Sequence, residues 1–249
     1  MLFRRNMKKN KTSEVMYKEE FDNDTGMELT SANIKELLKD NCDVIIRELY
    51  INAQEDLTVT LVFIDVLVDT KVINDNILKP LTQEMSLGKA KSCEEIIDMI
   101  EHGVLYHTSQ KTRDNISDCI RDIMDGSAAL IFDDVKKAVT FDVKDYEIRG
   151  ITEPVNENVI KGAKDSFIED FRTNIATLRR RIKSHNLVIE EIIIGRESHS
   201  KIGIVYLKGI TNQHIVEELR NRLKKIDVDG VLTMGVIEEN IIDNKYSPF

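Results

Sequence analysis

The segment from Leu57 to Val68 constrains the fold of this 249-residue chain more than any other part of it. It lacks proline, and from Leu61 onward only Asp65 interrupts its apolar residues. Apolar side chains fall on both faces of the expected strand: Val59, Leu61 and Phe63 on one, Val62 and Ile64 on the other. Successive strand residues point to opposite faces of a sheet, so a strand of this kind is usually covered on both sides. The segment predicts an α/β sheet with packed helices.

Helical and extended patterns alternate around this strand, which favours an α/β architecture. Further strands are expected at Val44–Ile51, Ser127–Phe132 and Ala138–Val143. Helices are expected after the capping residues Thr30 and Ser31, over Asn74–Met85 with Pro80 as a candidate kink, over Cys93–Ile100 behind the cap Ser92, and from Thr112 or Asp114 to Gly126. These patterns predict one compact unit in the first part of the chain.

The second part of the chain repeats the alternation. Apolar residues at helical spacing predict a long amphipathic helix over Lys164–Ile182. After it we expect strands at Leu187–Ile194 and Ile202–Leu207, a helix over Asn212–Ile226, a strand at Val231–Met234 and a short helix over Val236–Ile242. The organisation predicted is a mobile leader (1–29), a first α/β subdomain (30–146), a linker (147–163) and a second α/β subdomain (164–249), each subdomain a mixed sheet with packed helices.

Composition excludes several classes of protein. The net charge is −9, with 35 Lys and Arg against 44 Asp and Glu, which disfavours nucleic-acid binding because attraction to phosphate drives most of that affinity. No apolar run approaches the ~18 residues of a membrane span, and no signal peptide is recognised, so the chain as it stands is expected in the cytoplasm. Three widely spaced cysteines outside any CxxC predict neither a disulfide framework nor a zinc site.

No phosphate loop, nucleophile elbow or metal-protease motif is present in the sequence. Asp65, Asp69 and Asp133 follow apolar strands and could bind a divalent metal, so a metal-dependent hydrolase stays open as an alternative, beside the simpler hypothesis that they end strands and face water. The run Arg179–Arg181 ends the long helix, where cations complement the helix dipole. It could also dock a partner or an anionic lipid.

One string carries a family resemblance. Its residues are Arg149, Glu153, Pro154, Glu157 and Gly162, then Phe167, Glu169, Asn174 and Arg179, Arg180, Arg181, followed by Ile182. The string resembles the hallmark of the GerA family, the A subunits of bacterial spore germinant receptors. Segments Leu61–Asp65, Ala129–Asp133 and Ile241–Phe249 extend the resemblance, and Ala163 departs from it where the family usually has proline.

The resemblance implies a non-enzymatic N-terminal domain of two α/β subdomains, without a cofactor, that helps to assemble a receptor and to transmit a nutrient signal. A multi-pass membrane region would follow it, with this domain on the cytoplasmic side of the inner spore membrane. The implied partners are the B and C subunits and other A subunits, which together form an ion channel, with a small-molecule ligand open and no nucleic acid. We expect the string's residues, Arg149 to Arg181, to contact the other subdomain or a neighbouring subunit.

Overall fold

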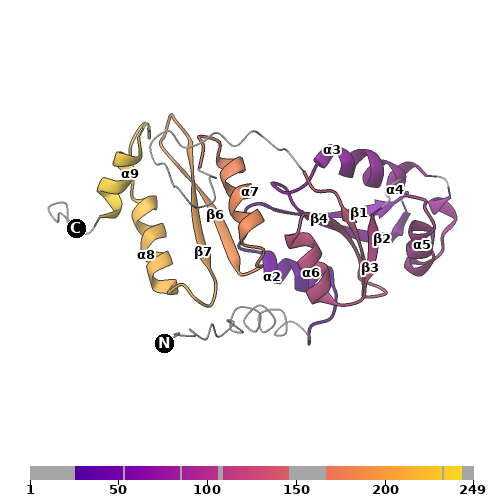
Figure 1. Ribbon diagram of the computed structural model, residues 1–249. Helices are drawn as coiled ribbons and strands as arrows, with labels where there is room; N and C mark the ends of the chain where they lie inside the picture. The colour runs from indigo at the N-terminus through magenta and orange to yellow at the C-terminus, as the bar shows by residue number, and fades with distance from the viewer. Residues whose placement is uncertain are drawn as a thin grey trace, which may run out of the picture.

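The protein is described by a computed structural model over residues 26–52, 54–84, 86–105, 109–145, 167–231 and 233–242. Residues 26–145 hold a five-stranded sheet and are called the first unit; residues 167–242 hold a two-stranded sheet and are called the second unit. The two units lie side by side (Figure 1). The expected leader up to residue 25 and the expected linker lie outside the described residues, so the predicted subdomain boundaries stay a proposal.

The sheet of the first unit has the order β1-β2-β4-β5-β3. Its strands are β1 (Val44–Ile51), β2 (Gln54–Ile64), β3 (Gln110–Arg113), β4 (Ser127–Phe132) and β5 (Lys137–Asp142). Each neighbouring pair is antiparallel, and so is the pair in the second unit, which corrects the expectation of mixed sheets. For the pairs β1–β2 and β4–β5 the reason is local, since each is a hairpin, whereas a parallel pair needs a long crossover.

Helices cover both faces of this sheet, as the pattern of β2 predicts. One face carries α3 (Thr70–Ile73), the π-helical η1 (Asn74–Leu78), α4 (Lys79–Gln83), the 3₁₀-helical η2 (Leu87–Lys89) and α5 (Cys93–Glu101). The other carries α2 (Ser31–Leu38) and α6 (Ile116–Met124). Leu57, Val59, Leu61 and Phe63 pack into the first core, while Val62 and Ile64 pack into the second. The α/β class is confirmed.

Two details of the first unit differ from the sequence prediction. The predicted helix over Asn74–Met85 includes a π-helical segment, and the candidate kink residue Pro80 lies in the first turn of α4 directly after it, where its missing N–H is least costly. The short strand β3 was missed because Gln110–Arg113 is entirely polar. The following helix therefore begins later than predicted, behind Asn115, whose side chain accepts a hydrogen bond from the backbone of Ser117 at 2.8 Å.

The second unit is a hairpin between helices. It consists of α7 (Phe171–Arg181), β6 (Leu187–Ile194), β7 (Ser200–Leu207), α8 (Gln213–Lys224) and α9 (Met234–Ile241). Leu187 and Ile189 pack against α7, whereas Val188, Ile204 and Tyr206 pack against α8 and α9. The hairpin is thus covered on both faces, and α7 lies on the side of the first unit (Figure 1).

The predicted limits of two elements here were wrong. Helix α7 begins at Phe171 because Asp170 caps it by accepting from Thr173 N at 2.8 Å, so Phe167 precedes the helix and is 63% exposed. The expected strand at Val231–Met234 is absent among the residues described there, and Met234 instead starts α9. No helix in the described ranges is long and apolar enough to span a membrane.

Candidate functional site

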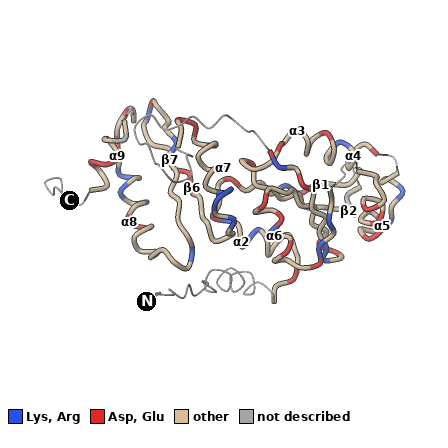
Figure 2. The backbone as a smooth tube through the Cα atoms, in the orientation of Figure 1, with Lys and Arg blue, Asp and Glu red and all other residues tan. Residues whose placement is uncertain are grey.

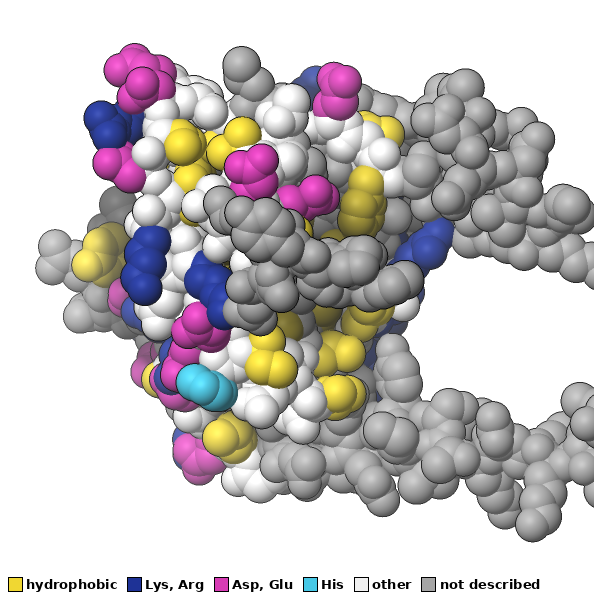
Figure 3. Space-filling view, turned by 90° about the vertical axis from the view of Figure 1, so that its left-hand side faces the viewer, with side chains coloured by type: hydrophobic (Ala, Val, Ile, Leu, Met, Phe, Trp, Pro, Cys, Tyr) yellow, Lys and Arg dark blue, Asp and Glu magenta, His cyan; other side chains and the backbone are white. Residues whose placement is uncertain are grey.

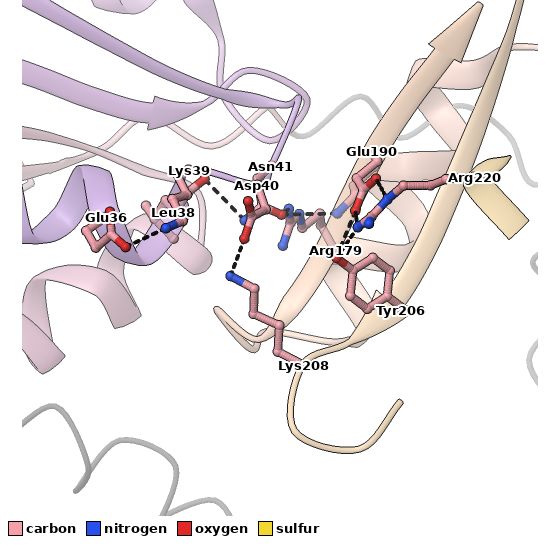
Figure 4. Close-up of polar contacts among 11 residues, drawn as sticks. Glu36, Leu38, Lys39, Asp40, Asn41, Arg179, Glu190, Tyr206, Lys208 and Arg220 are labelled. Atoms are coloured by element: carbon pink, nitrogen blue, oxygen red, sulfur yellow. Dashed lines mark hydrogen bonds and ion pairs between the residues drawn. The ribbon is translucent and has the colours of Figure 1, made fainter. Parts of the chain in front are cut away.

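The two units meet where the start of β1 approaches α7 and the outer edge of β6. We call this contact the junction, and define it by residues 40–43, Asp65 and Asp125 of the first unit and by α7, Lys183, residues 187–189 and Lys208 of the second. Figure 4 shows its centre, with Asn41 and Arg179 facing each other. Because the two sides are far apart in sequence, only tertiary structure brings them together.

Arg179 is the central residue of the junction. Its Nε and Nη2 donate to the two carboxylate oxygens of Asp43, each at 2.8 Å. Its Nη1 donates to Leu187 O at 2.8 Å, and Nη2 also donates to Asn41 Oδ1 at 2.7 Å. The side chains of Arg179 and Asp43 are only 1% and 2% exposed. A charge buried to this degree is tolerated because the planar guanidinium matches the carboxylate in two parallel bonds and two of its three remaining N–H donors are also engaged.

Backbone hydrogen bonds join the two sheets beside Arg179. Cys42 N donates to Ile189 O at 2.9 Å, and Ile189 N donates to Asn41 Oδ1 at 3.2 Å. The amide of Asn41 thus takes the place that a strand carbonyl would occupy against the edge of β6. On the other side, Asp65 N donates to Asp43 O at 2.9 Å, which holds the same segment in the first sheet. Residues 41–43 are therefore shared by both units.

Three exposed ion pairs surround this buried pair. Lys208 Nζ lies 2.6 Å from Asp40, Arg172 Nη2 lies 2.5 Å from Asp65, and Lys183 bonds Asp125. In all four pairs between the units, among the residues described, the second unit supplies the cation and the first supplies the carboxylate. Elsewhere acidic and basic residues are interspersed along both units (Figure 2). A positive surface on the second unit therefore meets a negative surface on the first, and such electrostatic complementarity fixes the orientation and register of the two surfaces.

Electrostatics at the rim favour the paired state. Burial raises the pKa of the Asp125 carboxyl, but hydrogen bonds from Lys144 and Lys183 outweigh it and leave that pKa below its ordinary value. Burial, with help from the charge of Asp43, raises the pKa of the Cys42 thiol to about 11, so this thiol is protonated near neutral pH.

A second polar cluster stiffens the hairpin behind the junction. Arg220 of α8 donates from Nε and Nη2 to both carboxylate oxygens of Glu190, each at 2.6 Å, and Tyr206 Oη donates to the same carboxylate at 2.8 Å. The Arg220 hydrogen bonds lower the pKa of Glu190, while burial and the Glu190 carboxylate raise the pKa of Tyr206. The cluster ties β6, β7 and α8 into one body, visible beside the junction in Figure 4.

The residues of the family string, predicted from the sequence to make contacts, lie in different parts of the structure. Arg149, Glu153, Pro154, Glu157 and Gly162 lie outside the described residues. Phe167, Glu169, Arg180 and Arg181 are exposed. Asn174 fixes the chain before α7, because its amide accepts from Ile168 N at 2.8 Å and donates to Ile168 O at 2.6 Å. Of the described members, Arg179 is the one that is buried against the first unit, since successive helical residues point about 100° apart.

Asn41 and Asp43 were not anticipated from the sequence. Polar residues before an apolar strand are common, and nothing in their spacing points to Arg179. The three aspartates of the hydrolase alternative are separated and individually engaged: Asp65 pairs with Arg172, Asp69 caps α3, and Asp133 accepts from Ser31 N at 2.6 Å. Within the described ranges, no group of three or more His, Cys, Asp or Glu is placed to hold a metal ion.

Comparisons with known proteins agree with one another. The family model described as Bacillus/Clostridium GerA spore germination protein matches residues 32–249. Spore germination protein KA of Bacillus subtilis (strain 168) is 29% identical over 88% of this chain and 39% of its own length. Spore germination protein B1 of the same organism is 32% identical over 76% of this chain and 38% of its own length. The chain thus spans about two fifths of these curated relatives.

A solved structure is also similar. It is the crystal structure of the N-terminal domain of the A subunit of the Bacillus megaterium spore germinant receptor GerK3. The two chains superpose with a TM-score of 0.66 at 28% sequence identity, over 90% of this chain and 83% of that one.

Proposed function

Because this chain belongs to the GerA family of Bacillus and Clostridium spore germination proteins, we propose that it acts in spore germination as the N-terminal domain of a germinant receptor A subunit. The relatives named as spore germination proteins and the likeness to an A-subunit domain support this role. In this proposal the domain holds and moves neighbouring parts of a receptor, and its side chains make and break no covalent bonds.

The setting of the domain belongs to the same proposal. The domain lies on the cytoplasmic side of the inner spore membrane, works with B and C subunits and with other A subunits, and passes a nutrient signal to a membrane channel. A small molecule remains a candidate ligand of the receptor. The chain covers about two fifths of the length of these curated relatives, which supports its placement as one part of a larger protein.

The observation that carries the signalling role is the construction of the junction. The buried Arg179–Asp43 pair sets one register between the units, while the exposed pairs around it are each worth only about 0–1 kcal/mol. A small change at the rim can therefore shift the angle between the units without unfolding either core. Such rigid-body movement about a polar interface is a common way to pass a signal.

The test places a charge of the wrong sign at the rim of the junction in the full-length protein in spores. Lys208→Asp would set two carboxylates against each other in place of the Lys208–Asp40 pair. We expect slower nutrient-induced germination, measured as loss of optical density, at unchanged protein level. Asp40→Lys combined with Lys208→Asp restores an ion pair of reversed sign and should return germination toward the wild-type rate.

The matched control is Lys136→Asp, which makes the same charge change at an exposed pair with Glu28 inside the first unit. Equal germination rates for Lys208→Asp, Lys136→Asp and wild type, at equal protein levels, would refute the signalling role of the junction. Normal germination of spores that lack the protein altogether, under every nutrient tested, would refute the receptor role itself.

A further inference from the structure

Most strand edges among the described residues are protected. The edge strand β1 carries Arg47 and Glu48 and has an irregular register near its end, and the opposite edge strand β3 is four residues long with Lys111 and Arg113. The outer edge of β6 is occupied by Cys42 at the junction. Charges, irregularities and covering segments of these kinds prevent a strand from pairing with another chain.

Strand β7 has less protection than these edges within the described ranges. It runs for eight residues, Ser200–Leu207, in regular register with β6, without proline and with Lys201 as its one charged residue. Lys201 is itself paired with Glu191 at 3.1 Å. Figure 3 views the molecule from the end formed by the second unit, where exposed hydrophobic side chains lie among charged ones. An edge of this kind is a template for adding a strand.

The register shows which backbone groups of β7 face outward. Leu187 pairs with Leu207, and Lys208 N donates to Asn186 O at 2.9 Å, so the even-numbered residues of β7 exchange hydrogen bonds with β6. The N–H and C=O groups of Lys201, Gly203 and Val205 therefore point away from β6. None of the hydrogen bonds between described residues engages them.

The side chains beside this edge leave room for a neighbour. On the face of α7, the Phe171 ring lies 3.0 Å from where a Cβ of Gly203 would be, so the glycine lets the ring approach the strand closely. On the same face Val205 is 37% exposed and Ile193 is 56% exposed. The even-numbered face of β7 is different, since Ile204 and Tyr206 are buried under α8 and α9.

We propose that β7 pairs antiparallel with β7 of a second copy of this chain, about a two-fold axis at Gly203. In this register Gly203 faces Gly203 of the other copy and Lys201 faces Val205, so all three outward residues of each copy are hydrogen-bonded. The two lysines lie at opposite ends of the contact and keep their Glu191 partners. Gly203 places no side chain of its own at the axis, and the Phe171 rings of the two copies lie next to it. The edge is thus complementary to itself, as an isologous contact requires.

This inference rests on the proposed function, since it names one surface through which A subunits self-associate. It uses none of the hydrogen bonds or ion pairs of the junction, because Gly203 and Val205 lie on the strand of the hairpin that is remote from Cys42 and Asp43 (Figure 1). The result is a continuous four-stranded sheet of two hairpins, β6-β7 of one copy followed by β7-β6 of the other.

The test is sedimentation velocity of the purified chain from micromolar to several hundred micromolar, with charge variants at Val205. In the proposed register Val205→Lys sets two like charges opposite each other at both ends of the contact, and we expect about tenfold weaker dimerisation. Val205→Glu places a carboxylate opposite Lys201 of the other copy and should tighten the dimer. Val205→Pro removes an outward N–H that β6 does not use and should abolish pairing, with Val205→Thr as its control.

Far-ultraviolet circular dichroism checks that each variant is folded, and if Val205→Pro is not, the Lys and Glu variants alone decide. A dimer that Glu strengthens and Lys weakens supports the proposal. A chain that stays monomeric throughout, or a dimer equally stable in all variants, overturns it. Comparison of the Val205 variants by sedimentation tests the β7 contact alone, so germination of spores without the protein separately decides the receptor role.

Discussion

Replacing Arg179 is the sharpest test of how the two units are held together. Arg179→Leu would leave the Asp43 carboxylate buried at 2% exposure without a counter-charge, and would leave Leu187 O and Asn41 Oδ1 without the guanidinium. Removing one partner of a buried ion pair typically costs about 3–5 kcal/mol. Since a domain is usually stable by only about 5–15 kcal/mol, we expect a loss of about a fifth or more of the free energy of unfolding.

The assay is urea unfolding followed by far-ultraviolet circular dichroism, because the chain has no tryptophan to report by fluorescence. The control is Arg180→Leu, one residue along the same helix turn and exposed, which should change stability by less than about 0.5 kcal/mol. Adding Asp43→Asn to Arg179→Leu removes the uncompensated charge and should recover part of the loss. Equal effects of the Arg179 and Arg180 variants, within about 1 kcal/mol, would refute the central role assigned to the buried pair.

Two further predictions concern the hairpin. The Arg220 hydrogen bonds lower the pKa of Glu190, so its contribution to stability is complete above the ordinary value of 4.5 and is lost as the pH falls below it. Glu190→Gln should therefore destabilise the protein near neutral pH and flatten the acid side of the stability profile, as measured by urea midpoints; an unchanged profile would contradict the pairing. Gly203→Ala places a methyl group 3.0 Å from the Phe171 ring and should cost about 1 kcal/mol in thermal unfolding. Phe171→Leu in the same chain should relieve that cost, and additive losses would show that the contact is absent.

Much of the fold could be predicted from local patterns. Alternating apolar residues in β2 predicted a sheet covered on both faces, and Val59 and Val62 do pack into different cores. Ser92 was expected to cap α5, and its hydroxyl accepts from Glu95 N at 3.3 Å. These predictions succeed because periodicity and capping act between residues a few positions apart. The polar strand β3 has no such signature and gains its place only by pairing with β5.

The sequence by itself determined the α/β class, the core-facing residues of β2, α5 and α6, and the family, through a string of residues much of which lies outside the described ranges. Tertiary structure alone decided that Arg179, and neither Arg180 nor Arg181, is buried at the junction, because its partner Asp43 is 136 positions away. It also decided that no described residue pairs with the outer edge of β7, whereas Cys42 pairs with the outer edge of β6. Local chemistry sets what each segment can form, but pairing between distant segments sets which polar groups are buried and which remain for a partner.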